Sequence, residues 1–227
     1  MSLTASPQII NSGQVSTISW VTQNATVLEL DPSPGVVTGT SYEVAPGDTT
    51  VYTLHASDGV TIVSQDVVVG VRPTISGFGV SPSPIQCGQL ITFNWQVTGA
   101  ANLNLSPFAG NVTGRTAASV QLKRNALFQL TASNDAGSTT ADLLVVAPPV
   151  VDEFQADQAS LSDGGVATIT YSTECTDAAS ISPDAGVALA LNSQSNFQVS
   201  PSITTTYTLT AVSDAGSTQS QLTISVP

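Results

Sequence analysis

The stretch Gly13-Gln14-Val15-Ser16-Thr17-Ile18-Ser19-Trp20 decides the fold, because its pattern returns twice further along the chain. Gly88 precedes Trp95 by the same interval, and Gly164 precedes Tyr171. The copies follow one another at a spacing of about 76 residues, which is too long for a solenoid unit and long enough for a small domain. The sequence therefore predicts a tandem array in which each copy has its own core.

Each copy alternates apolar and polar residues with the period of two that is typical of a β-strand. Ile18 and Trp20 share one face of the first such strand, and a second aromatic column follows later in each copy. These strands end at Asp-Gly or Asp-Ala-Gly turns, which are typical of hairpins. The aromatic residues predicted to form the structural core are Trp20, Tyr52, Trp95, Phe128, Tyr171 and Tyr207.

The expected fold class is all-β. Each copy contains six or seven expected strands and no convincing helical periodicity, which predicts a β-sandwich. Prolines at Arg72-Pro73 and Pro148-Pro149 place the boundaries, giving domains at residues 1–72, 73–148 and 149–227. Because proline fixes φ, the linkers are expected to be short and stiff, which predicts a semi-rigid rod.

These residues resemble the bacterial and bacteriophage immunoglobulin-like (Ig-like) domains. The resemblance rests on the strands Thr17–Trp20 and Thr204–Ala211 and on the closing Asp214-Ala215-Gly216-Ser217 turn, and it covers essentially the whole chain. It implies three tandem Ig-like β-sandwich domains. Such domains serve as spacers, adhesive tips and decoration on unrelated proteins, so the resemblance implies a fold more than a function.

Composition excludes several function classes. Sixteen acidic residues and four basic residues give a net charge of −12, which would repel a phosphate backbone, so nucleic-acid binding is not expected. No apolar run has the roughly 18 to 20 residues of a membrane span, so membrane insertion is not expected. The chain starts without a basic and apolar leader, which argues against a signal peptide.

The residues offer little for catalysis or redox chemistry. The single histidine, His55, is expected on the wet face of its strand, and no paired acids repeat, so the sequence does not predict an enzyme. Cys87 and Cys175 occupy different columns of the repeat, so both are expected to be unpaired, with an intermolecular bridge as the alternative. Their spacing matches no zinc motif.

No cofactor is expected, and calcium is the one metal alternative. Asp152 and Glu153 lie at the second boundary and are the candidate calcium ligands, because carboxylate oxygens are the ligands that calcium prefers. Four other residues are candidate contact residues for a partner: Phe108, which lies in a turn outside the aromatic columns, and the basic residues Arg115, Lys123 and Arg124.

The expected function is that of a non-catalytic structural and adhesion module on the exterior of a large assembly. A bacteriophage virion decoration or tail accessory protein fits a chain whose first strand follows the initiator Met1 directly. The expected partners are other structural proteins of a virion or cell surface and host glycans or host proteins, contacted weakly and in many copies. The alternatives are the stalk or adhesin fragment of a secreted bacterial cell-surface protein, and a carbohydrate-binding module.

Overall fold

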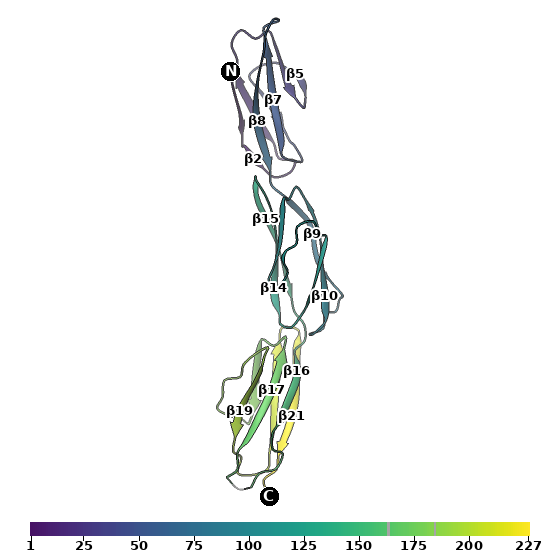
Figure 1. Cartoon of the computed structure of the whole chain (residues 1–227), viewed down its shortest axis with the longest axis vertical. Coiled ribbons are helices and arrows are strands. Elements are labelled where there is room, and N and C mark those ends of the chain that lie inside the picture. The colour runs from purple at the N-terminus through teal and green to yellow at the C-terminus, as the bar shows by residue number, and fades with distance from the viewer. Residues whose placement is uncertain (163, 184) are drawn as a thin grey trace. The chain divides into compact units, whose positions relative to one another are not determined.

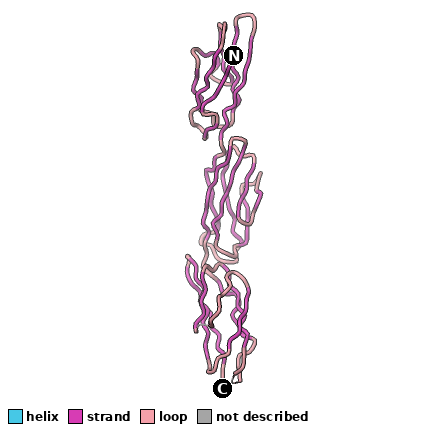
Figure 2. The backbone as a smooth tube through the Cα atoms, turned by 90° about the vertical axis from the view of Figure 1, so that its left-hand side faces the viewer, coloured by secondary structure: helices cyan, strands magenta, loops and turns pink. Residues whose placement is uncertain are grey.

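The computed structural model describes residues 1–162, 164–183 and 185–227, which form strands joined by turns and loops (Figures 1 and 2). These residues form 21 strands and no helix, so the prediction of an all-β chain is confirmed. Accordingly, nothing in the described ranges is a helix long and apolar enough to cross a membrane.

The first strand set, β1 to β8, has the sheet order of an Ig-like sandwich. One sheet has the order β1-β3-β6 and the other has the order β2-β8-β7-β4-β5. The chain therefore crosses from one sheet to the other between β1 and β2, and β2 runs parallel to β8. The strands are β1 (Ser2–Ser6), β2 (Ile9–Ile10), β3 (Ser16–Val21), β4 (Val27–Asp31), β5 (Gly35–Val37), β6 (Ser41–Val44), β7 (Thr50–Ser57) and β8 (Ile62–Val71).

The second and third strand sets keep this order with fewer strands. The second set forms sheets β13-β10-β9 and β12-β11-β14-β15, and the third forms β16-β17-β19 and β18-β20-β21. The second set comprises β9 (Thr74–Ser81), β10 (Leu90–Thr98), β11 (Asn102–Ser106), β12 (Gly110–Asn111), β13 (Ala117–Gln121), β14 (Ala126–Asn134) and β15 (Gly137–Val145). The third comprises β16 (Val150–Ala156), β17 (Ala167–Glu174), β18 (Ala178–Ser182), β19 (Gln194–Val199), β20 (Thr205–Ser213) and β21 (Gly216–Ile224).

The described residues pack into two compact units. Unit 1 comprises Met1–Phe78, Trp95–Thr116 and Gln129–Ala141, and unit 2 comprises Gly79–Asn94, Ala117–Phe128 and Asp142–Pro227. Strands β9, β10, β14 and β15 therefore contribute residues to both units. The domain boundaries at 72/73 and 148/149 stay a prediction from the sequence.

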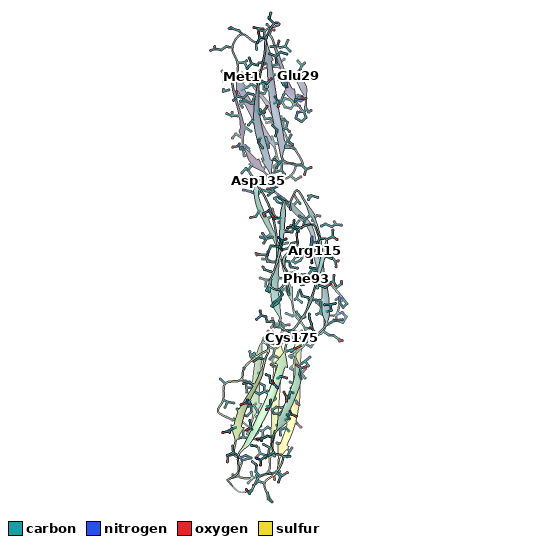
Figure 3. All side chains as sticks on the ribbon, viewed as in Figure 1. Met1, Glu29, Phe93, Arg115, Asp135 and Cys175 are labelled. Atoms are coloured by element: carbon teal, nitrogen blue, oxygen red, sulfur yellow. A yellow bond between two sulfur atoms is a disulfide. The ribbon has the colours of Figure 1, made fainter. Side chains whose placement is uncertain are left out.

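The cores consist of the inward-facing residues of the alternating strands. In β3, Ile18 and Trp20 are buried, and in β7 Tyr52 and Leu54 are buried in the same cluster. The six aromatic residues of the two repeated columns are all buried: Trp20, Tyr52, Trp95, Phe128, Tyr171 and Tyr207. Phe93, which Figure 3 labels, is fully buried, and its ring centroid lies 4.4 Å from that of Phe128.

The aromatic residues Trp20, Trp95 and Tyr171, which occupy matching positions of the three copies, each carry a polar group that is hydrogen bonded. The indole N–H of Trp20 donates to the carbonyl of Gly39 (3.1 Å), and that of Trp95 donates to the carbonyl of Arg115 (2.9 Å). In the third strand set the Tyr171 hydroxyl accepts from the backbone N–H of Ala190 (2.6 Å). A large aromatic residue can therefore be buried here without leaving its polar atom unpaired.

The aromatic pattern does not extend to Tyr42. The sequence pattern pairs Tyr42 with Phe197 as an inward-facing position, but Tyr42 is 40% exposed whereas Phe197 is buried. Tyr42 on β6 and Phe197 on β19 both lie on edge strands, opposite Ile18 and Ile169, so the edge position does not account for the difference in exposure.

Replacing Leu54 with alanine tests the first core. Leu54 is fully buried, so Leu54→Ala should lower the free energy of unfolding by about 2–5 kcal/mol, through lost burial and the cavity left behind. Val51→Ala, at an exposed position of the same strand, is the matched control and should change stability by no more than about 0.5 kcal/mol. Urea unfolding curves measure both, and equal losses for the two variants would contradict this packing.

Candidate functional site

Unit 1 contains a polar joint built around Val71, where β8 ends. The N–H of Val71 donates to Thr49 Oγ1 (2.9 Å), and its carbonyl accepts from the side-chain amide of Asn134 (2.8 Å). The same amide nitrogen donates to the carbonyl of Gly99 (2.8 Å), while Asn134 Oδ1 accepts from the N–H of Ala136 (2.8 Å). Asn134 therefore holds the end of β8 to the turn before β11.

A second bond closes this first joint. Thr139 Oγ1 donates to the carbonyl of Pro73 (2.7 Å). Asn134 and Thr139 thus supply hydrogen-bond donors to two carbonyls of the segment Val71–Pro73. Proline has no N–H and interrupts the strand ladder, so side chains take over the role of backbone partners here.

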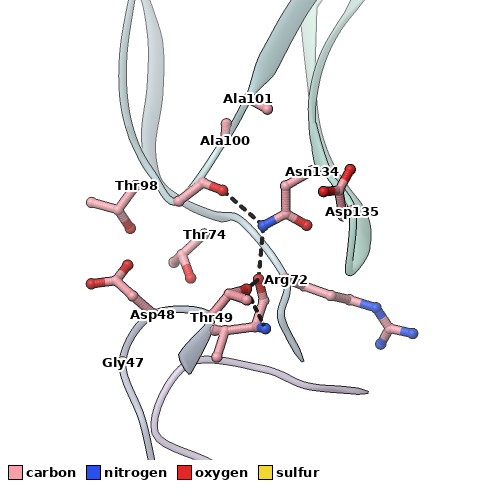
Figure 4. Close-up of a pocket in the computed structure, with 12 residues that line it drawn as sticks. Gly47, Asp48, Thr49, Arg72, Thr74, Thr98, Ala100, Ala101, Asn134 and Asp135 are labelled. Carbon is pink, nitrogen blue, oxygen red and sulfur yellow. Dashed lines mark hydrogen bonds between the residues drawn. The ribbon is translucent and has the colours of Figure 1, made fainter. Parts of the chain in front are cut away.

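The first joint surrounds a hollow of about 370 Å³ (Figure 4). Small residues form much of its wall, including Gly47, Gly99, Ala100 and Ala101. Asp48 and Asp135 lie on opposite sides of the hollow, so their carboxylates do not converge on one point.

Unit 2 contains a second joint of the same design, built around Ala147. The N–H of Ala147 donates to Asn125 Oδ1 (2.9 Å), and its carbonyl accepts from the hydroxyl of Ser213 (2.9 Å). Thr218 Oγ1 donates to the carbonyl of Pro149 (2.6 Å). Ser213 and Thr218 therefore play the same roles as Asn134 and Thr139.

A disulfide strengthens the second joint. Cys87 and Cys175 are bonded to each other, with Cα atoms 5.9 Å apart, so the expectation that both are unpaired is wrong. The two cysteines occupy different positions of the repeat, but this does not prevent pairing. The bridge links the second strand set to the third and does not link the two sheets of one sandwich. The side-chain amide of Asn125 also donates to the Cys175 carbonyl (3.1 Å), and Lys123 pairs with Glu174 (3.2 Å).

The two joints have equivalent backbone positions for this disulfide. Cys87 precedes Gly88, whose N–H donates to the Leu122 carbonyl, and Ser12 precedes Gly13, whose N–H donates to the Pro46 carbonyl. Cys175 (φ 53°) and Gly99 (φ 72°) both have left-handed backbone conformations. Each also lies two residues before an N–H that bonds the neighbouring strand: Asp177 to Val212 and Ala101 to Ser133. In the first joint, Ser12 and Gly99 therefore stand where the second joint has its cysteines.

The candidate calcium ligands, Asp152 and Glu153, both lie in the second unit. Burial raises the pKa of the Asp152 carboxyl and the Glu174 carboxylate raises it further, while Lys123 acts in the opposite direction. Both oxygens of Glu153 accept from side-chain amides, one from Gln155 and the other from Gln194. Among the described residues, no three His, Cys, Asp or Glu side chains form a group that could hold a metal.

The four candidate contact residues are divided between the units. Phe108 and Arg115 belong to unit 1, whereas Lys123 and Arg124 belong to unit 2. Phe108 is 54% exposed and has a φ of 82°, a backbone conformation that is rare for a bulky residue. Lys123 is engaged by Glu174, so part of its charge is neutralised within the joint. Their role as contact residues stays a prediction.

Sequence reasoning missed the joint residues. Asn134 and Ser213 stand directly before the repeated Asp-Ala-Gly turns, and Thr139 and Thr218 follow those turns at the same interval. The second and third copies thus place a hydrogen-bonding side chain at two matching positions, one directly before the turn and one after it. Aligning the copies shows these matching positions. They were explained by turn formation alone, so their second role as donors to the joint carbonyls was not predicted.

Comparison with known proteins finds similarity to a curated bacterial protein. The chain is 30% identical over 229 residues to an uncharacterized protein of Ruminiclostridium cellulolyticum, and the match covers 96% of this chain. The chain spans 62% of the length of that relative. No protein family model matches the chain.

Similar solved structures are tandems of Ig domains, but the similarity is distant. They include Sidekick-1 immunoglobulin domains 1–5 (12% identity, 96% of this chain, 56% of that chain, TM-score 0.37). They also include the titin fragment I67–I69 (14%, 96% and 94%, TM-score 0.37) and the mouse nectin-like molecule 4 ectodomain (12%, 96% and 96%, TM-score 0.38). With these TM-scores, the Ig-like assignment rests on the sheet order and strand register of the chain itself.

Removing the disulfide should destabilise unit 2. Cys87→Ser/Cys175→Ser should lower the free energy of unfolding by about 2–4 kcal/mol, because the bridge restricts the unfolded chain. Denaturant unfolding with and without reductant measures this. The unmodified chain in reductant should match the double variant, and the double variant should not respond to reductant. An unmodified chain that is insensitive to reductant would contradict the bridge.

Cysteines at the equivalent positions of the first joint should form a new bridge. In Ser12→Cys/Gly99→Cys, a Cβ at Gly99 meets only ordinary contacts, 3.8 Å from Pro73 Cα and 3.9 Å from Asp48 Oδ1. Cys175 also shows that cysteine tolerates the required φ. Thiol titration and non-reducing peptide mapping should find the 12–99 bridge in a glutathione buffer. Ser12→Cys/Ala101→Cys is the control, and free thiols in both folded variants would show that the joints are not equivalent.

Proposed function

We propose that the chain is a non-catalytic structural and adhesion module displayed on the exterior of a large assembly. The observation that carries the proposal is the disulfide between Cys87 and Cys175. Disulfides persist in oxidising surroundings outside the cytoplasm and are rare where thiols are kept reduced. A bridge that fastens one Ig-like strand set to the next is suited to a protein that works outside the cell.

The chemistry of the joints supports a structural role. In both joints, side chains at equivalent positions bind backbone carbonyls: Asn134 and Thr139 in the first, Ser213 and Thr218 in the second. These side chains fix the segments that connect one strand set to the next. This use of polar groups fits a scaffold that presents surfaces to partners.

The carrier proposed first is a bacteriophage virion, as a decoration or tail accessory protein. Many copies on one particle would convert weak contacts with host-surface glycans or proteins into strong attachment. The net charge of −12 disfavours the packaged nucleic acid as a partner and favours a position away from it.

A secreted bacterial cell-surface protein is the second candidate. The disulfide favours this carrier, because export through an oxidising compartment would form the bridge during maturation. In this case the chain would be part of a stalk or an adhesin.

Locating the native protein tests the proposal and separates the two carriers. Antibodies against the chain are applied to purified virions, to intact cells and to the cytoplasmic fraction of the producing bacterium, and peptide mapping reports the state of Cys87 and Cys175. We expect surface labelling of virions with the bridge intact. Labelling of intact cells alone would replace the first carrier with the second. A cytoplasmic protein with both thiols free would overturn exterior display altogether.

A further inference from the structure

The end of the first strand set that contains Asp58 corresponds to the surfaces that form the two joints. Ser57, Ser133 and Val212 are equivalent, because each pairs with the first residue of the neighbouring strand, β4, β11 or β18. The residues that follow them, Asp58, Asn134 and Ser213, are therefore equivalent too. Each one accepts a hydrogen bond from the backbone N–H two residues further on.

Both joint donors are missing at this end. Asn134 and Ser213 donate to the carbonyls of Val71 and Ala147. The carboxylate of Asp58 can only accept, and its Oδ1 already accepts from the N–H groups of Val60 (2.9 Å) and Thr61 (2.7 Å). These backbone hydrogen bonds lower the pKa of Asp58, so the group stays charged at neutral pH.

The second donor is replaced by an aliphatic side chain. Val63 pairs with Ala56, as Thr218 pairs with Ala211, so Val63 stands where the third strand set has its carbonyl-binding threonine. Thr139 holds the corresponding place in the first joint. In the first joint, the carbonyls of Val71 and Pro73 accept from two side-chain donors. A similar segment at this end would instead meet the Asp58 carboxylate and the aliphatic Val63.

The surface around Asp58 is open and combines polar residues with exposed aliphatic ones. We call it the tip and define it as residues 21–27 and 57–63. Ala132 and Ala211 are fully buried in the joints, whereas the equivalent Ala56 is only half-buried. Val60 is 94% exposed in the turn between β7 and β8. The other exposed aliphatic residues of the tip are Val21, Val27, Ile62 and Val63.

A hollow of about 360 Å³ adjoins the Asp58 carboxylate at the tip. Its wall includes Gln23, Asn24, Asp58, Thr61 and Val63, together with Met1. The hollow therefore combines one fixed negative charge with amide, hydroxyl and aliphatic groups. Sugar recognition usually relies on stacking against aromatic rings, and the residues that line this hollow are not aromatic.

From these features we infer that the tip binds a protein partner which presents a lysine or arginine side chain flanked by apolar residues. The cation pairs with Asp58 inside the hollow, and the flanking residues cover Val60 and Val63. The chain as a whole carries a net charge of −12, which attracts a basic partner and disfavours an acidic one. The inference rests on the proposed adhesion function and specifies the chemistry of its partner.

Selection of peptides on the purified chain tests the inference. A library of random twelve-residue peptides displayed on filamentous phage is selected on the immobilised chain and counter-selected on Asp58→Asn/Val63→Thr, which restores the side-chain types of the joints. We expect the recovered peptides to contain lysine or arginine beside apolar residues. Their affinity for Asp58→Asn should fall about tenfold or more, because the ion pair is lost.

A matched control separates the tip from general charge. Asp66→Asn removes an exposed carboxylate of β8 that accepts from Thr53, and it should leave the affinity unchanged. Circular dichroism and thermal unfolding should show that both variants remain folded, since asparagine can accept the same turn bonds as Asn134 does. Peptides without basic residues, or peptides that bind Asp58→Asn and the chain equally, would overturn the inference.

Two further measurements test whether the tip binds a sugar or a second copy of the chain instead. Binding to a glycan panel that depends on Asp58, or self-association in sedimentation equilibrium that Asp58→Asn abolishes, would replace the basic protein segment with a sugar or a second copy. Because these assays use the purified chain, they are independent of the cellular location. The proposal of exterior display can therefore be overturned while binding at the tip is confirmed. Binding at the tip can likewise be overturned while exterior display is confirmed.

Discussion

The need to pair backbone carbonyls beside a proline shapes the joints of this chain. Where β8 ends, Pro73 supplies no N–H, so the ladder that satisfies the strand cannot continue. The carbonyls of Val71 and Pro73 nevertheless lie against the turn that follows β14, where an unpaired carbonyl would be costly. Side-chain donors on either side of that turn pair with these carbonyls, and the same arrangement recurs at Ala147 and Pro149.

The two joints use this solution to different degrees. Each neutral hydrogen bond contributes on the order of 1 kcal/mol, so the bonds of Asn134 and Thr139 stabilise the first joint modestly. In the second joint the disulfide dominates, because a covalent link restricts the unfolded chain. The Lys123–Glu174 pair adds little, since Lys123 is 63% exposed and water screens its charge. Units 1 and 2 therefore contain the same joint with different strength.

The sequence predicted the strands well and the joints poorly, for physical reasons. Alternation and aromatic spacing are local, so they identified the all-β class and residues such as Trp20, which is buried as its column indicates. Tyr42 departs from its column although its strand position matches that of Phe197, so neither spacing nor register alone specifies exposure. Pairing of Cys87 with Cys175 depends on residues that the fold brings together across 88 positions of sequence. The donors Asn134 and Ser213 likewise depend on the fold, which brings them to the distant carbonyls of Val71 and Ala147.

The contrast between Asp58 and Asn134 also bears on how copies of the chain would assemble. A joint surface at one end of a strand set and its carbonyls at the other end form a heterologous pair, and such pairs propagate into open filaments when they recur between molecules. Placing an acceptor and an aliphatic side chain at Asp58 and Val63 removes both donors from one partner of that pair. The chain can thus repeat the joint chemistry at Val71 and Ala147 while the surface around Asp58 lacks the donors that would extend it.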